Sequence, residues 1–491
     1  MAESLTCVFH RGRGRRNLNR TPAINRLPVE ILQEIFMHCR THDRRPSRKL
    51  APLLLCQICS RWREVALSIP RLWNRLSLDG NQYNVLRAMV TFINATALWF
   101  ACVGRHCPLS YSIHIHHEAT TQFPGWNFLF PLPPFIRELD LEMADDSQLT
   151  MYSGLQKDAL EFLEAARICV HSENPLSIVA RRFPFSSAPR LRSLALDITW
   201  SSDPFEPHFP QMPWGQLTCL ILTRGVPLDE WHEIIRLSPL LQRCYAQIEI
   251  HMEEESLDVG SVTKATLNHL EDLTLLFYMW PALDETLAGL HLPALKSLHL
   301  GCHDEVDFEL TSEHVLPIFQ NTQLTAFTLQ QGLFEPDLFR IPVIMDAVTT
   351  LDIAGDMLYT DLVNLLHHNA DANPVVFPRL QHLRLGILDY HYNADPWSFP
   401  SELLHNALAS RWWPDGGVSG EYASGTTPPG ALSRLEDVSI FVDEKHPDTL
   451  DEVVQALKPL QAQGLDIDVR SGTRYDWMYP QDKRGQWRID V

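Results

Sequence analysis

The side chains that could do chemistry are few, and no complete site can be recognised among them. Cys56 and Cys59 have C-x-x-C spacing, but no second pair follows at the spacing of a zinc site, and both lie in an apolar helical pattern. His114 and His116 would share one face of a predicted strand, but two histidines alone do not complete the ligand set of a metal site. We therefore interpret the two cysteines as packing residues, with metal or redox chemistry as the alternative, and we predict no metal site.

Sequence motifs of enzymes are absent as well. The chain contains no phosphate-binding loop, no dinucleotide fingerprint and no Gly-x-Ser-x-Gly elbow. The segment Trp231-His232-Glu233 lacks the second histidine of a zinc-protease helix. We expect no catalytic residue and no cofactor, and hence a protein that is not an enzyme. A hydrolase with an unrecognised site is the alternative, and it would contain a buried cluster of groups with shifted pKa values.

Length and charge limit the kinds of partner. The 491 residues exceed the roughly 250–300 residues of one hydrophobic core, which indicates several domains or a repeat array. A formal net charge of -19 opposes contact with phosphate backbones, so we expect protein partners and no nucleic acid. No apolar run reaches the about 18 residues of a membrane span. The scattered cysteines favour a reducing compartment, the cytoplasm, the nucleus or both.

Three segments lack the patterns of packed elements. Residues 1–22 contain a run of arginine and glycine, which predicts a disordered basic tail, with nuclear import or RNA contact as the alternative. Residues 414–430 are rich in Gly, Pro, Ser and Thr and predict a flexible insertion. Residues 470–491 are polar and predict a loose tail or cap.

Residues 23–76 form a separate unit that we expect to be all-α. Pro28 suits the first turn of a helix, and an apolar stripe continues from it to Phe36. After a polar break, a second helix is predicted from about Pro52 to Ala66. About 50 residues cannot bury this much apolar surface among themselves, so the unit is expected to bind a partner.

From about residue 130 one phrase recurs, namely a leucine, two variable residues and an apolar-variable-apolar triplet. The alternation predicts a strand, because successive side chains of a strand face opposite ways. The phrase begins at Ile136, Leu191, Leu217, Leu270, Leu295, Leu324, Val348, Leu380 and Leu435. Most intervals lie in the twenties, with a degenerate copy near Leu241, and this is the period of leucine-rich repeats.

The segments between the phrases agree with a repeat array. A first, atypical turn is predicted as a helix over 83–100 and a strand over 108–116. Two intervals, from Leu139 to Leu194 and from Leu383 to Val438, predict two turns each because they are twice as long. Return helices are predicted at 229–237, 312–319, 361–367 and 448–457. The predicted fold is α/β: an all-α unit, then an irregular leucine-rich-repeat solenoid over 82–469, with a curved parallel sheet and outer helices.

The N-terminal unit resembles the F-box. The residues that match are Leu27 to Leu32, with Ile35 and Phe36, followed in order by Cys56 to Arg63 and Ala66 to Trp73. The combination with degenerate repeats is most similar to the F-box families of mushroom-forming fungi. The stretch from Arg40 to Pro52 is longer and more basic than the usual link between the first two blocks.

The resemblance implies a role and not a reaction. F-box proteins bind a Skp adaptor, which joins them to cullin and RING subunits that ubiquitinate a captured target. The resemblance also implies that apolar side chains on the helix faces contact the adaptor. The alternative is that such side chains fill the unit's own core, and we favour this alternative for Phe36 and Leu55. The implied adaptor-binding residues are Leu27, Pro28, Ile31, Leu32, Ile35, Ile58 and Trp62.

The solenoid would hold the target. If the leucines of each phrase point inward, the residue between them lies on the concave face, which is polar and suits a protein target; loops are the alternative. The candidate target-binding residues are Asp140, Thr274, His299, Thr328, Asp352, Arg384 and Ser439. We therefore predict the substrate receptor of a Skp–cullin–F-box ubiquitin ligase acting in protein degradation. The alternative is an interaction scaffold that binds the adaptor without ubiquitinating anything.

Overall fold

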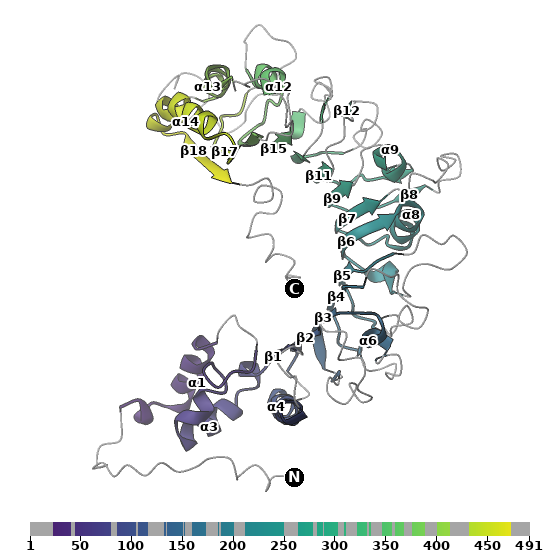
Figure 1. Ribbon diagram of the computed structural model, residues 1–491, viewed down its shortest axis with the longest axis vertical. Helices are drawn as coiled ribbons and strands as arrows, with labels where there is room; N and C mark the ends of the chain where they lie inside the picture. Colours follow the sequence, from purple (N-terminus) through teal and green to yellow (C-terminus); the bar gives the residue numbers. More distant parts are fainter. Residues whose placement is uncertain are drawn as a thin grey trace, which may run out of the picture.

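The computed structural model of the protein has N-terminal helices followed by a long parallel sheet (Figure 1). It describes residues 23–40, 45–79, 86–104, 107–115, 132–133, 135–150, 152, 160–172, 185, 188–200, 212–249, 264–277, 282–287, 289–302, 309–310, 322–330, 333–334, 346–355, 359–367, 376–387, 400–412 and 432–472. The predicted tail 1–22, insertion 414–430 and return helix 312–319 lie outside these residues, as does most of the predicted C-terminal tail.

The N-terminal unit folds as short helices around a small aromatic core. Its elements are η1 (Ala23–Arg26), α1 (Val29–His38), α2 (Leu55–Ile58), α3 (Ser60–Leu67) and η2 (Pro70–Leu72). Phe36 and Leu55 are buried, as expected, and the rings of Phe36 and Trp62 lie 5.0 Å apart.

The prediction of one continuous second helix is wrong. The backbone of Cys59 is extended and interrupts the helix between α2 and α3. Its sulfur accepts the backbone N–H of Trp62 at 3.4 Å and so caps α3.

Fourteen parallel strands form one sheet in the described part of the chain, in the same order as in the sequence. They are β1 (Arg75–Asp79), β2 (Leu109–Ile115), β3 (Ile136–Met143), β4 (Ala165–Val170), β5 (Ser193–Asp197), β6 (Cys219–Pro227), β7 (Arg243–Glu249), β9 (Asp272–Phe277), β11 (Ser297–Cys302), β13 (Ala326–Gln330), β15 (Thr350–Gly355), β16 (His382–Ile387), β17 (Asp437–Asp443) and β18 (Asp466–Gly472). This arrangement is consistent with a solenoid.

The connections between these strands contain helices and two minor sheets. The helices are α4 (Leu86–Val103), α6 (Ser147–Thr150), η7 (Trp214–Gln216), α8 (Leu228–Leu237), α9 (Ala282–Leu287), α12 (Tyr359–Leu366), α13 (Ser401–Ser410) and α14 (Pro447–Ala462). The minor sheets pair β8 (Ala265–Thr266) with β10 (Leu290–His291), and β12 (Glu309–Leu310) with β14 (Leu333–Phe334). In Figure 1 the strands line the inner side of an arc, and α8, α9 and α12 lie on its outer side.

The two long intervals have different structures. The first contains an extra strand, β4, as predicted, because it pairs with both β3 and β5. The prediction of two turns in the second interval is wrong, since β16 pairs directly with β17. Between them lies α13, which buries Leu404, Ala407 and Leu408 at helical spacing. One turn is therefore longer and contains a ten-residue helix.

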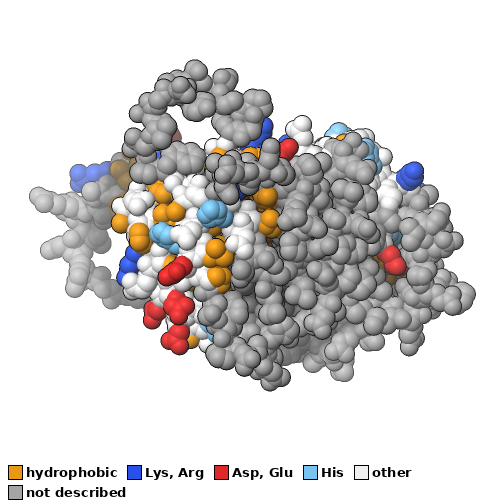
Figure 2. Space-filling view, turned by 90° about the horizontal axis from the view of Figure 1, so that it is seen from above, with side chains coloured by type: hydrophobic (Ala, Val, Ile, Leu, Met, Phe, Trp, Pro, Cys, Tyr) orange, Lys and Arg blue, Asp and Glu red, His pale blue; other side chains and the backbone are white. Residues whose placement is uncertain are grey.

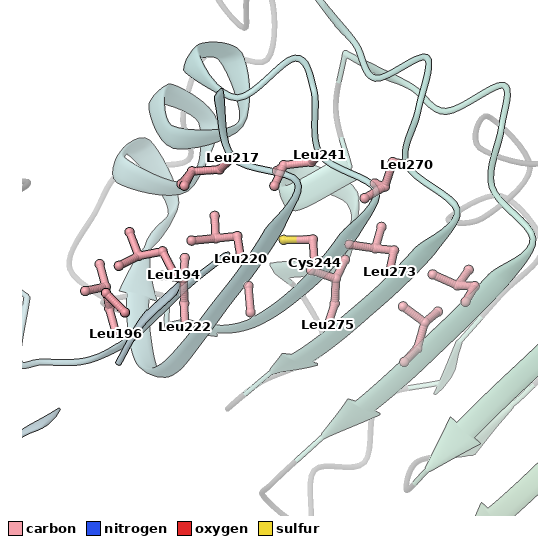
Figure 3. Packing of buried hydrophobic residues seen from close by; sticks show 14 of the residues in the cluster. Leu194, Leu196, Leu217, Leu220, Leu222, Leu241, Cys244, Leu270, Leu273 and Leu275 are labelled. Atoms are coloured by element: carbon pink, nitrogen blue, oxygen red, sulfur yellow. The ribbon is translucent and has the colours of Figure 1, made fainter. Parts of the chain in front are cut away.

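Leucines on the face of the sheet that is turned away from the concave side form the core. In Figure 3, Leu194, Leu220, Cys244 and Leu273 follow one another on four neighbouring strands, and each is at the same register position. All four are buried. Because each side chain packs on its counterpart in the next turn, the strands stabilise one another and no turn is stable alone.

The N-terminal unit shares this core. The indole N–H of Trp73 donates to the carbonyl of Ala66 at 2.8 Å, and the ring meets Trp99 of α4 edge to face at 4.9 Å. The indole N–H of Trp99 donates in turn to the carbonyl of Arg75, the first residue of β1. This joint connects the helices to the first strand of the sheet without a linker between them.

The alternation of inward and concave residues can be tested on β13. Leu329 is fully buried, so we expect Leu329→Ala to lower the free energy of unfolding by about 2–5 kcal/mol through lost burial and a cavity. Thr328 is its neighbour on the opposite face, and Thr328→Ala is expected to cost about 0.5 kcal/mol or less. Urea unfolding followed by tryptophan fluorescence measures both. Equal shifts in the two midpoints would contradict the assignment of the faces.

Candidate interaction surfaces

Exposed apolar side chains are concentrated in the N-terminal unit. Eight large hydrophobic residues are exposed in the described part of the chain, and six of them lie between residues 24 and 67. These six are Ile24, Val29, Ile31, Leu54, Ile58 and Leu67. Seen from the C-terminal end of the arc, apolar side chains on the described surface instead form small groups among acidic, histidine and other polar ones (Figure 2). Exposed apolar residues gathered in one small domain are typical of a protein-binding surface.

The predicted adaptor-binding residues fall into three groups. Pro28, Ile31 and Ile58 are exposed, with 48% of Ile31 and 52% of Ile58 accessible. Leu27 and Ile35 are partly buried against the core of the unit. Leu32 and Trp62 are buried, so these two assignments are corrected: the side chains fill the unit's own core. The indole of Trp62 packs on Phe36, which faces inward from α1, and the helix spacing that suggested a contact also serves that packing.

The start of α1 is held in place by α3. The guanidinium of Arg61 donates to the carbonyl of Leu27 at 2.6 Å. This bond fixes the chain just before Pro28, where the exposed face of α1 begins. The apolar face is therefore presented on a fixed backbone, which lowers the entropy cost of binding a partner.

The concave face has one continuous central column. Strand register places one residue of each of the fourteen strands side by side, from Ser77 in β1 to Asp468 in β18. All seven predicted target-binding residues lie in this column: Asp140, Thr274, His299, Thr328, Asp352, Arg384 and Ser439. Arg167 and Tyr245 were missed by the sequence analysis and occupy the same column. The alternation of Ala166, Ile168 and Val170 in β4 could have identified Arg167.

Several charged groups of this face bind one another. Asp140 accepts from Arg167 at 3.0 Å and lies 3.3 Å from His114 Nε2. Glu142 lies 3.0 Å from His171 Nε2. Farther along the column Arg384 donates to Asp352 at 3.3 Å, and only 8% of Asp352 is accessible. Of the predicted target-binding residues, Asp140 and Asp352 are thus already partnered within the sheet.

The His114 network shifts two pKa values. The hydrogen bond with Asp140 raises the pKa of His114 above its ordinary value, although burial opposes this. Burial alone would raise the pKa of Asp140, but the hydrogen bond with His114 and the charge of Arg167 outweigh it and lower that pKa. Both groups therefore favour their charged forms.

Three side chains next to this network have the donor atoms of a cation site. The nearest donor atoms of Glu142, Cys169 and His171 all lie within 4.8 Å of one another. Burial and the Asp197 carboxylate raise the pKa of the Cys169 thiol to about 12, so the thiol keeps its proton. That thiol donates to Asp197 at 3.4 Å. These side chains form a hydrogen-bonded cluster, and a cation could bind the Cys169 sulfur only by displacing its proton.

The His114–Asp140 pair predicts a dependence on pH. A raised pKa in the folded state contributes stability that is fully present below the unfolded pKa of about 6.5 and is lost as pH rises through the folded value. We therefore expect Asp140→Asn to lower the urea midpoint more at about pH 6 than at about pH 9. In a His114→Gln background this difference should disappear. A cost independent of pH in both backgrounds would show that the pair is not formed.

Comparison with known proteins identifies the N-terminal unit and none of the remainder. No helix within the described residues has the length and apolar character needed to cross a membrane. No curated protein matches the chain. Residues 24–79 match the protein-family model described as F-box-like, and this range includes α1, α2, α3, η2 and β1. The chain therefore contains an F-box-like domain at residues 24–79.

Proposed function

We propose that the protein is the substrate receptor of a Skp–cullin–F-box ubiquitin ligase. The F-box-like domain binds the Skp adaptor, and through it the cullin and RING subunits. The parallel sheet is a degenerate leucine-rich-repeat solenoid whose concave face binds a protein target. The protein itself is not catalytic, and the ligase complex marks the target for degradation. The observation that carries this proposal is the set of exposed apolar side chains on the F-box-like domain.

An adaptor contact accounts for this exposed apolar surface. Ile31 lies on α1 and Ile58 ends α2, and both expose about half of their surface. Fully burying an exposed isoleucine yields about 1.5–3 kcal/mol, so covering the exposed half of each side chain in an interface yields about 1 kcal/mol. Helices that present apolar residues on one face commonly bind in this way.

The concave face has the size and chemistry of a protein-binding surface. Its central column extends over fourteen strands, and neighbouring strands of a sheet lie about 4.8 Å apart. It is polar, with threonine, histidine and charged side chains, and is continuous from the F-box-like domain to β18. A long concave face of this kind suits an extended protein segment.

The free thiols support a reducing compartment. All eight cysteines whose side chains the structure describes are free. Reduced cysteines are typical of the cytoplasm and nucleus, where cullin ligases would meet this receptor. We place the activity in one or both of these compartments.

Loss of adaptor binding should follow from changes at the exposed isoleucines. We expect Ile31→Ser/Ile58→Ser in the full-length chain to abolish co-elution with a purified Skp adaptor, because truncating an interface anchor costs about 2 kcal/mol or more. Both side chains are half exposed, so the thermal unfolding midpoint should stay nearly unchanged. Size-exclusion chromatography and differential scanning fluorimetry measure the two properties.

Leu240 provides a matched control. It is 43% exposed and lies outside the F-box-like domain, between α8 and β7, so Leu240→Ser should leave co-elution intact. Adaptor binding that survives the double substitution would contradict the proposed surface. A complex that binds the adaptor but never recruits cullin would indicate a scaffold without ubiquitination.

A further inference from the structure

Four side chains with metal-ligating atoms form a row across strands β2 to β5. The register pairs each of these residues with the next, two residues beyond the central column. The row consists of His114, Glu142, Cys169 and Asp197. It lies on the concave face, as the column does, because residues two apart in a strand share a face. His171 follows Cys169 by two residues and continues this face just beyond the end of β4.

Three of these side chains have nearly the spacing of ligands in a tetrahedral metal site. The donor atoms of Glu142, Cys169 and His171 all lie within 4.8 Å of one another. His171 Nε2 lies 3.0 Å from Glu142 Oε1 and 3.8 Å from Cys169 Sγ. The bond lengths of zinc place tetrahedral nitrogen, oxygen and sulfur ligands about 3.4–3.6 Å apart. Rotation of these side chains is therefore enough to complete the geometry, and the strands need not move.

The two carboxylates of the row are each oriented by an arginine. Glu142 turns Oε1 toward the cluster, and its Oε2 lies 3.7 Å from Arg167 Nη1. Asp197 accepts from the Cys169 thiol at 3.4 Å on Oδ2, and Arg224 donates to its Oδ1 at 2.8 Å. Outer hydrogen bonds of this kind fix the orientation of ligands in metal sites. The cluster thus has both a set of ligand atoms and the surrounding groups that hold them.

The cluster is accessible from solvent, and its backbone is fixed. The side chain of His171 is 44% exposed and that of Glu142 is 19% exposed, whereas Cys169 is buried. The backbone N–H of His171 donates to the carbonyl of Met143 at 2.9 Å, which extends the pairing of β4 with β3. A cation could enter past His171 and keep one coordination position for water, as zinc does in sites with three protein ligands.

The types of ligand atom select the cation. Calcium and magnesium prefer oxygen ligands, so a thiol and an imidazole disfavour both. A thiolate, an imidazole and a carboxylate together are ligands that zinc accepts. Only the thiolate binds zinc, so binding releases the proton of the Cys169 thiol to solvent. The exchange of one proton for a divalent ion raises the charge of the cluster by one.

We propose that Glu142, Cys169 and His171 bind a zinc ion on the concave face. The sequence analysis predicted no metal site, because Glu142 and His171 are 29 residues apart in the chain and only the pairing of β3 with β4 brings them together. The inference goes beyond the proposed receptor function and does not depend on it. A bound ion would link β3 to β4 and make the charge of the adjoining concave face depend on zinc.

A cobalt titration of the full-length chain tests this site. Co²⁺ binds the same ligand types as Zn²⁺, and its bond to a thiolate absorbs strongly in the near ultraviolet. We expect about one equivalent of Co²⁺ to bind with this absorption, and Zn²⁺ to displace it. Zn²⁺ should also raise the thermal unfolding midpoint, because it binds the folded state. Mg²⁺ and Ca²⁺ should leave the midpoint unchanged.

Two variants locate the bound ion. Cys169→Ser should remove the thiolate absorption, and His171→Gln should weaken zinc binding at least about tenfold. Because the side chain of His171 is 44% exposed, His171→Gln should fold like the wild type. The matched controls are Cys219→Ser, at another free cysteine of the sheet, and His382→Gln, at another partly exposed histidine that contacts a carboxylate. Both controls should bind zinc like the wild type.

Three results would overturn the proposal. Thiolate absorption that persists in Cys169→Ser would place the metal at other cysteines, such as Cys56 and Cys59. Zinc affinity that is unchanged in His171→Gln would exclude the imidazole as a ligand. If zinc neither displaces cobalt nor raises the midpoint of the wild type, the three side chains form a hydrogen-bonded cluster and no metal site.

Discussion

The architecture depends on the burial of one column of leucines along the sheet. Leu194, Leu220 and Leu273 occupy equivalent positions and contact their counterparts in adjacent turns (Figure 3). Each turn alone would leave such a side chain half exposed, at a cost of about 1–2 kcal/mol, so stability arises only between neighbours. The order of the strands follows, since each turn can pack only on the preceding one. Register follows too, because a shift by one residue would turn the leucines to the concave side.

The sequence predicts the strands of this fold better than it predicts breaks within helices or the burial of single charged residues. Alternation and spacing were enough for strands whose core-facing positions are leucines. The doubled interval predicted that a strand such as β4 exists but not which residues form it, because Ala166 and Ile168 stand at its core-facing positions, and β1 was not predicted because it follows the N-terminal helices directly. The break at Cys59 depends on a backbone conformation that the apolar pattern does not encode. Arg411 would be assigned to the surface by its charge. Instead it is buried and donates to three backbone carbonyls, and burial lowers its pKa to about 10.

The candidate sites show the same limit. A helical stripe identifies which residues are apolar, but it cannot separate a core residue such as Leu32 from an exposed one such as Ile31 one position earlier. That distinction depends on where α3 packs. On the concave face the column was predictable, because it follows from alternation alone. Which of its charges are already paired was not, because the partners come from strands about 27 residues apart, as Asp140 and Arg167 do.

The shared core gives the two interaction surfaces a fixed relation. Trp73 belongs to the F-box-like domain, Trp99 to the first return helix, and the hydrogen bond from Trp99 reaches β1. The buried residues of both regions form one continuous cluster. A flexible linker would let a bound target sample many distances from the adaptor, whereas this joint holds the concave face at one orientation. The path along the sheet from β1 grows by about 4.8 Å per strand, and because the sheet follows an arc (Figure 1), each strand faces the F-box-like domain at its own fixed angle.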